Sequence, residues 1–364
     1  MATVQASGEN RILIRSLLFA SEASVLAGTG LYSLPEHIKL DGINLRAQTG
    51  LMYFWLMESG RLTHFVSFPR ETWPQHFDIS PDGTRVAVIF YEVSLKDKRP
   101  HGLGCYSFSE KKWLWKWKWS QDEVEGFPQA VKILPGGRRI LVLGYQSIWY
   151  YDVETGQKVY EWRRLLRDYV VWRYALRTSY LSPSGRYLVI WQEKPFEGGA
   201  LWRNRDVTVW DLERGKEISR WKKPTYECVF AKFSPDEENI VFGCKDGYVR
   251  EWSIRGRAPT KELKTKGGVY SLLFSPDGRL LSVESGIGTI AVFDYLRQKE
   301  VHQFAVLNKG PYSFRTMGEQ YPMAFSSQGE YFALLDKGKI CLYSTSTWEQ
   351  KWCVDPKPPN VPHD

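Results

Sequence analysis

A short phrase recurs along the whole chain and constrains the fold more than any other feature. It consists of an apolar strand, a tight turn of the Ser-Pro-Asp-Gly type and a second apolar strand. Proline suits the second position of such a turn, and glycine supplies its positive-φ position. Six copies are clear and a degenerate seventh stands first, at residues 16–23, 80–83, 134–137, 182–185, 234–237, 275–278 and 326–329.

A second hairpin with alternating apolar and polar residues follows each copy, as at residues 148–162 and 207–221. Two hairpins give four strands per unit, and no stretch has the pattern of a long amphipathic helix. A single four-stranded sheet leaves its faces uncovered, whereas a ring of sheets covers them. The sequence therefore predicts an all-β, seven-bladed β-propeller with four antiparallel strands per blade. The blades are expected to start near residues 12, 74, 128, 174, 228, 268 and 321 within one domain, 12–354, flanked by tails at 1–11 and 355–364.

The repeat resembles the WD40-like (WD-repeat) β-propeller family over nearly the whole chain. The Gly-His dipeptide of that family is missing from every blade, and Trp-Asp occurs once, at Trp210-Asp211. The hydrogen-bonded tetrad of the family is therefore not expected here, and aromatic packing between blades, drawing on the 16 Trp, is expected in its place. Two closures are open: the last blade supplies its own outer strand near 348–354, or, as is more usual in the family, an N-terminal strand completes it.

Three features of the composition bear on the class of protein. Hydrophobic residues at 43% and aromatic residues at 15% exclude a disordered chain. The first residues contain no apolar segment typical of a signal peptide, and no apolar run is long enough to span a bilayer. Five scattered cysteines without a C-x-x-C pair are expected to be reduced thiols, which favours a cytoplasmic location without membrane contact.

Loop lengths indicate which face of the propeller binds a partner. In each blade the a–b and c–d turns lie on one face, and the b–c and d–a connections lie on the other. The a–b and c–d turns are short, with 255–261 the longest, whereas the other class holds every sizeable insertion. These insertions are the b–c loops 29–51, 92–104 and 192–205 and the d–a connections 163–173 and 305–320. Long loops on a rigid frame collect binding residues, although neutral drift accounts for one or two of them equally well.

The positive charge is concentrated in the same sector. The chain has a formal net charge of +8, and residues 161–223 carry 14 Arg and Lys against 8 Asp and Glu. Arginine beside exposed aromatic residues is typical of protein interfaces and also suits phosphate contact and base stacking. Aromatics packed beneath loops, with solvated Arg around them, would give the same composition. The candidate partner-binding residues are Arg163, Arg164, Arg167, Trp172, Arg173, Phe196, Trp202, Arg203 and Arg205.

Alternating tryptophans mark the outer strand expected in blade two. A period of two places Trp113, Trp115, Trp117 and Trp119 on one face, and Lys112, Leu114, Lys116 and Lys118 on the other. We expect the tryptophans to be largely buried between blades, with Lys116 and Lys118 exposed; a binding edge is the alternative. A further expectation is that Asp82, Gly137, Gly185, Asp236, Asp277 and Gln328 occupy equivalent turn positions.

No catalytic motif is recognisable. H-E-x-x-H, Walker A, G-x-S-x-G and EF-hand patterns are missing, and the six His show no metal-ligand spacing, so no metal and no cofactor is expected. Residues 152–162 do resemble the tryptophan-bearing hairpin of quinoprotein-like propellers, which implies an exported, typically eight-bladed enzyme with a calcium-supported quinone. This chain offers seven units, no export signal and no vicinal Cys pair.

The sequence therefore favours a non-catalytic protein-binding scaffold subunit of a larger assembly. Its partner, another protein, is expected on the face that carries the long loops. One alternative is nucleic-acid contact through the basic, aromatic sector 161–223. The other is an enzyme of unrecognised type.

Overall fold

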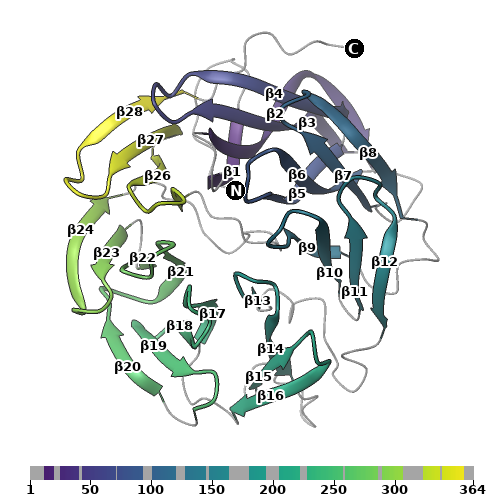
Figure 1. Cartoon of the computed structure of the whole chain (residues 1–364). Coiled ribbons are helices and arrows are strands. Elements are labelled where there is room, and N and C mark those ends of the chain that lie inside the picture. The colour runs from purple at the N-terminus through teal and green to yellow at the C-terminus, as the bar shows by residue number, and fades with distance from the viewer. Residues whose placement is uncertain are drawn as a thin grey trace. The chain divides into compact units, whose positions relative to one another are not determined.

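The computed structural model describes residues 12–19, 25–40, 43–70, 72–92, 101–119, 128–144, 147–163, 180–193, 205–221, 228–256, 259–285, 289–305, 323–336 and 338–355. Within these ranges the regular elements are all β-strands, and no α-helix occurs. The strands form seven four-stranded sheets, each made of consecutive antiparallel strands (Figure 1). This architecture is the predicted seven-bladed β-propeller.

The four strands of each blade are named a, b, c and d in chain order. Blade one contains β1 (Ile12–Phe19), β2 (Val25–Leu40), β3 (Ile43–Leu56) and β4 (Leu62–Arg70), and blade two contains β5 (Thr72–Ile79), β6 (Arg85–Glu92), β7 (His101–Ser107) and β8 (Lys112–Lys118). Blade three contains β9 (Pro128–Ile133), β10 (Arg139–Gly144), β11 (Ser147–Asp152) and β12 (Lys158–Arg163), and blade four contains β13 (Tyr180–Leu181), β14 (Tyr187–Glu193), β15 (Arg205–Asp211) and β16 (Lys216–Trp221). Blade five contains β17 (Cys228–Phe233), β18 (Asn239–Cys244), β19 (Tyr248–Ser253) and β20 (Pro259–Lys264), and blade six contains β21 (Val269–Phe274), β22 (Leu280–Ser285), β23 (Thr289–Asp294) and β24 (Lys299–Ala305). Blade seven contains β25 (Met323–Phe325), β26 (Tyr331–Asp336), β27 (Lys339–Ser344) and β28 (Gln350–Val354).

Burial along the strands follows their position in the blade. In β18 and β22, both b strands, every residue after the first is buried. In the outer strand β24, exposed and half-buried residues alternate along the whole strand. Successive side chains of a strand point to opposite faces, so the b strands are covered on both faces and the outer strand is partly open to solvent.

The contacts of the chain separate it into two compact units. The first comprises residues 1–144, 149–161 and 310–364. Its hydrophobic clusters each join two sheets: Leu17 and Trp55 of blade one meet Ile340 of blade seven, and Phe54 meets Val88 of blade two. A third cluster joins blades two and three around buried residues such as Leu103 and Ile140.

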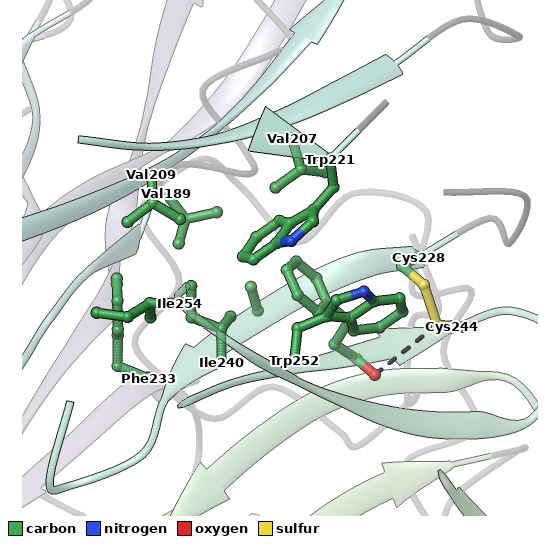
Figure 2. Close-up of a cluster of buried hydrophobic side chains, with 12 residues drawn as sticks. Val189, Val207, Val209, Trp221, Cys228, Phe233, Ile240, Cys244, Trp252 and Ile254 are labelled. Carbon is green, nitrogen blue, oxygen red and sulfur yellow. Dashed lines mark hydrogen bonds between the residues drawn. A yellow bond between two sulfur atoms is a disulfide. The ribbon is translucent and has the colours of Figure 1, made fainter. Parts of the chain in front are cut away.

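The second unit comprises residues 145–148 and 162–309 and holds blades four to six. Between blades four and five, Val189 and Val209 pack with Phe233 and Ile240 (Figure 2). Between blades five and six, Val249 packs in one buried cluster with residues such as Leu281. In both units the core is therefore a series of layers between sheets.

The last blade is completed from its own end of the chain. Its sheet runs β25–β26–β27–β28, so strand d comes from residues 350–354. The first strand of the described chain, β1, is strand a of blade one and pairs with β2. Of the two closures left open by the sequence, the structure shows the one in which the last blade supplies its own outer strand.

The b–c connection of blade one differs from the expected loop. Residues 29–51 lie almost entirely in β2 and β3, which continue as a paired antiparallel ribbon to Leu40 and Ile43. β1 pairs with β2 only as far as Tyr32, so the ribbon extends beyond the four-stranded part of the sheet. The expectation of an irregular loop was wrong because the two arms of the insertion pair with each other around a two-residue tip.

The tryptophan row of β8 does not lie on a single face. The register between β7 and β8 shifts between Cys105 and Tyr106, which are paired with Trp115 and Trp113. This β-bulge turns Trp113 toward the cluster between blades one and two, whereas Trp115 packs against the cluster between blades two and three. Trp119 is buried, and the other three tryptophans are half-buried, so their expected burial was overestimated. Lys116 and Lys118 are exposed, as predicted.

Four of the five cysteines are not reduced thiols. Cys228 is joined to Cys244 across β17 and β18 (Figure 2), and Cys341 is joined to Cys353 across β27 and β28. In both pairs the residues are direct partners in the register of adjacent strands. Cys105 remains a free, buried thiol. The expectation of five reduced cysteines is corrected because scattered positions in the sequence become neighbours when the hairpins form.

Candidate interaction surface

Each blade has two chemically different ends. Because its four strands form an antiparallel meander, the a–b and c–d turns share one end, and the b–c and d–a connections share the other. We call these the turn end and the loop end. Every described strand pair at the turn end is joined by four or five residues, such as 80–84 and 212–215. At the loop end the strand bounds leave longer connections at 93–100, 119–127, 164–179, 194–204 and 306–322.

The loop ends are not equally elaborated. In blade five, β18 and β19 are joined by a tight turn in which Gly247 has a φ of +85°. Asp246 in this turn forms an ion pair with the buried Arg250 at 2.7 Å. Thr265 donates its backbone N–H to the carbonyl of Gly247 at 2.8 Å, which closes this end of the blade. The longer b–c connections belong to blades two and four, and in blade one the paired strands β2 and β3 themselves extend this end.

The a–b turns at the other end are stabilised by their own side chains. Ser80 donates its hydroxyl to Asp82 at 2.5 Å, and it accepts the backbone N–H of Arg85 at 2.9 Å. Ser275 and Asp277 repeat this arrangement in blade six. The fourth residue of each turn has positive φ, as at Gly83, Gly137, Gly185, Glu237, Gly278 and Gly329. The predicted equivalence of turn positions was therefore wrong by one residue for Gly137 and Gly185, which align with Gly83 and not with Asp82.

The c–d turns use a carboxylate to hold the chain. Asp152 accepts the backbone N–H groups of Glu154 at 3.1 Å and of Thr155 at 2.8 Å. The hydrogen bonds from the backbone and hydroxyl of Thr155 lower the pKa of Asp152 below its usual value. Asp211 and Asp294 hold the corresponding turns of blades four and six. The Asp of the Trp210-Asp211 dipeptide therefore organises its own turn.

Polar groups also link neighbouring blades at the turn end. Arg85 of blade two forms an ion pair with Glu154 of blade three at 3.0 Å. Ser184 of blade four donates its hydroxyl to Glu237 of blade five at 2.8 Å. These groups are occupied with contacts inside the protein, so much of the polar character of the turn end already serves the fold.

Tryptophans of the outer strands provide a second link between blades. Trp115 donates its indole N–H to the carbonyl of Val153 in the next blade at 2.8 Å. Trp221 makes the same contact with the carbonyl of Gly256 at 2.8 Å, and Trp352 with that of Met57 at 2.6 Å. In each case the acceptor follows strand c of the neighbouring blade. Aromatic packing between blades was expected, and it includes these hydrogen bonds from the outer strand to the adjacent c–d turn.

Most candidate partner-binding residues lie outside the described residues. These are Arg164, Arg167, Trp172, Arg173, Phe196, Trp202 and Arg203. For Arg163 and Arg205 the structure gives the backbone only: Arg163 ends β12, and Arg205 begins β15 opposite Glu193. Both positions are at the loop end of their blades.

Part of the basic segment 161–223 is neutralised within blade four. Arg186 contacts Asp211 at 2.9 Å at the turn end. Arg220 contacts Glu217 at 2.5 Å and the buried Asp206 at 3.5 Å. The positive charge available to a partner at the loop end therefore rests on the arginines and lysines of the connections and not on these two.

Two exposed apolar side chains on β12 were not singled out in the sequence. Val159 is 50% exposed and Tyr160 is 53% exposed, although each belongs to a residue type that is usually covered. The ring of Tyr160 lies 6.1 Å from that of Tyr150 on β11. The alternation Lys158-Val159-Tyr160-Glu161 did not reveal them, because both faces of an outer strand carry mixed side chains.

Burial within the fold raises the pKa values of the Cys105 and Tyr295 side chains. Burial raises the pKa of the Cys105 thiol to about 12, which keeps it protonated and unreactive. Burial and the neighbouring Glu251 raise the pKa of Tyr295, which donates its hydroxyl to that carboxylate. Within the described ranges, no group of three or more His, Cys, Asp or Glu side chains has an arrangement suited to a metal ion.

No helix in the part of the chain described by the structure has the length and apolarity needed to cross a bilayer. No protein-family model matches the sequence.

Proposed function

We propose that this chain is a WD40-like propeller that acts as a non-catalytic, protein-binding scaffold subunit of a larger assembly. Its partner docks at the loop end of blades two to four. The observation that carries this proposal is the difference between the two ends of the blades. The turn end consists of four- and five-residue turns, whereas the loop end includes connections such as 164–179 and 194–204.

The chemistry of the two ends supports the same assignment. Carboxylates such as Asp152 and Glu154 are engaged within the fold at the turn end. The long connections contain Arg with Trp and Phe, which are enriched among the residues that dominate binding energy at protein interfaces. A partner with an acidic surface fits this charge.

The exposed pair on β12 is a second candidate contact on the outer strand of blade three, nearer the turn end than the loop end. Val159 and Tyr160 offer apolar area on a strand that ends at Arg163. Tyrosine supplies a large, rigid contact with a polar end, which suits the core of an interface.

Affinity capture from the native host tests the proposal. Wild type, a loop-end variant R164E/R167E and a turn-end variant R138E/R139E are compared, with circular dichroism to confirm folding. Arg138 is the last residue of the a–b turn of blade three and Arg139 begins β10; both are exposed, so the charge change is matched. We expect a specific protein partner to be lost from the loop-end variant and retained by the turn-end variant. Loss from the turn-end variant alone would contradict the proposal.

Nucleic acid is the second candidate partner because residues 161–223 carry a net positive charge and aromatic side chains. Binding through phosphates weakens steeply as salt rises, since it works by counterion release. Fluorescence anisotropy with a labelled oligonucleotide at about 50 and 200 mM salt measures this dependence. R163E/R164E/R167E should weaken binding to all sequences and flatten the dependence, and wild type that fails to bind at low salt excludes this candidate.

We do not propose a cytoplasmic location. The expectation of a reducing compartment rested on five reduced cysteines, and two disulfides are present in the structure.

A further inference from the structure

The strand at the C-terminal end of the propeller is joined covalently to its neighbour. β28 is the outer strand of blade seven and pairs with β27. Cys341 of β27 and Cys353 of β28 are register partners linked by a disulfide. The linked residues are 12 positions apart, so the bond encloses the hairpin that carries the outer strand.

The residue beside this disulfide contacts blade one. Trp352 donates its indole N–H to the carbonyl of Met57 at 2.6 Å. Its ring lies against Gly60, where a Cβ would be 2.7 Å from the indole. Trp352 and Val354 also pack against the hydrophobic cluster shared by blades one and seven. β28 is therefore a joint between the first and last blades within the first unit.

The two disulfides differ in their access to solvent. Cys228 and Cys244 are 6% and 0% exposed, in a layer with Trp221 and Trp252 (Figure 2). Cys341 is 2% exposed, but Cys353 is only half-buried. A reductant must reach a sulfur to attack it, and Cys353 is the most exposed residue among the four linked cysteines.

We propose that the Cys341–Cys353 disulfide is a reducible latch that holds β28, and through Trp352 the seam between blades seven and one. A dithiol reductant attacks the sulfur of Cys353 through one thiolate, and the sulfur of Cys341 leaves. The second thiol of the reagent then displaces Cys353 and closes the reagent to a disulfide. Two electrons and two protons pass from the dithiol to the two cysteines, which become thiols.

Opening the latch changes how β28 is held. With the bond intact, β28 cannot separate far from β27, because the cross-link limits the open states of the hairpin. In the dithiol form the backbone ladder and the packing of Trp352 and Val354 retain the strand without a covalent link. Transient release of β28 would uncover the edge of β27 and the parts of Met57 and Gly60 that Trp352 contacts in the oxidised protein.

Alkylation under native conditions tests the access difference. The folded full-length chain is treated with dithiothreitol at neutral pH, alkylated at intervals and analysed by peptide mass mapping. Cys341 and Cys353 should be alkylated at least about tenfold faster than Cys228 and Cys244, because their disulfide is the accessible one. Equal rates for the two pairs, or alkylation of Cys341 and Cys353 without reductant, would overturn the proposal.

Hydrogen exchange tests the latch itself. Amides of residues 350–354 should exchange at least about tenfold faster after reduction, while those of β18 remain unchanged. The variant C341S/C353S should show the same fast exchange without reductant and should not respond to it. W352F, which keeps the disulfide but loses the bond to Met57, should respond to reduction as wild type does. Exchange in β28 that is unaffected by reduction would contradict the latch even if both cysteines react.

Discussion

Trp115 donates its indole N–H to the carbonyl of Val153 at 2.8 Å, joining the outer strand of blade two to blade three. The same ring lies against Gly156, where a Cβ would be 2.5 Å from the indole. One side chain thus supplies a directed hydrogen bond and a close packing contact between two sheets.

Trp115→Phe removes the donor and keeps an aromatic ring. We expect unfolding free energy to fall by about 1–3 kcal/mol, since the carbonyl of Val153 loses its partner. Urea denaturation measures the change. Tyr160→Phe is the control: Tyr160 is 53% exposed, so its loss of unfolding free energy should stay within about 0.5 kcal/mol. Equal stability of the two variants would show that the indole bond contributes nothing.

Gly156→Ala and Gly137→Ala separate backbone strain from packing. Both glycines have a φ of +69°, but nothing lies within 4 Å of a Cβ at Gly137. Gly137→Ala should lower the unfolding free energy by about 1–2 kcal/mol, because alanine is strained in the left-handed backbone conformation. Gly156→Ala should cost about 1–3 kcal/mol more, because its methyl group displaces Trp115. Equal losses in denaturation would contradict the close contact.

Tyr295→Phe tests a buried link between blades six and five. Tyr295 is 7% exposed and donates its hydroxyl to Glu251, which is 5% exposed. Its raised pKa keeps the hydroxyl protonated across the physiological range. Removing the hydroxyl should cost about 1–3 kcal/mol, because a buried carboxylate oxygen loses a donor. A melting temperature equal to that of wild type would show that Glu251 does not depend on this bond.

Acidification should weaken the c–d turn of blade three. The bonds from Thr155 lower the pKa of Asp152, so its stabilisation is present above the ordinary carboxyl pKa and is lost as pH falls through the folded value. Asp152→Asn keeps an acceptor oxygen but does not titrate. Urea denaturation between about pH 7 and pH 3 should show a smaller loss of stability for the variant than for wild type. If wild type and the variant lose the same stability as pH falls, the carboxylate charge of Asp152 does not stabilise the turn.

The fold was predictable because its signals are local. A Ser-Pro-Asp-Gly turn such as 80–83 specifies its hairpin through hydrogen bonds between near neighbours. The disulfides depend on register, yet one signal was available: the hairpin around the turn at Asp236 and Glu237 brings Cys228 within one residue of Cys244, and the β-bulge between Cys228 and Phe230 makes the two cysteines direct partners. The bulge at β8 left no such signal, because period-two alternation continues in the sequence while the register of the pair shifts.

For the candidate site, the sequence could predict only the end of the blades at which its residues lie. Strand order assigns Arg163 and Arg205 to the loop end, since the end of a connection follows from the topology. The arrangement of side chains in long connections depends on contacts that have no periodicity in the sequence. The exposed Val159 and Tyr160 were missed for a related reason, because residue type does not distinguish a covered outer strand from an open one.

The dissociation constant of the captured partner tests the central claim most directly. Arg164→Ala and Trp172→Ala at the loop end are compared with R138E/R139E at the turn end, using calorimetry on folded protein. At least one loop-end variant should lose about 2 kcal/mol or more of binding free energy, which is the loss typical of a dominant interface residue. The turn-end variant should bind within about threefold of wild type, as expected for residues outside the interface. Unchanged binding by the loop-end variants, together with a large loss in R138E/R139E, would place the partner on the opposite end and contradict the account.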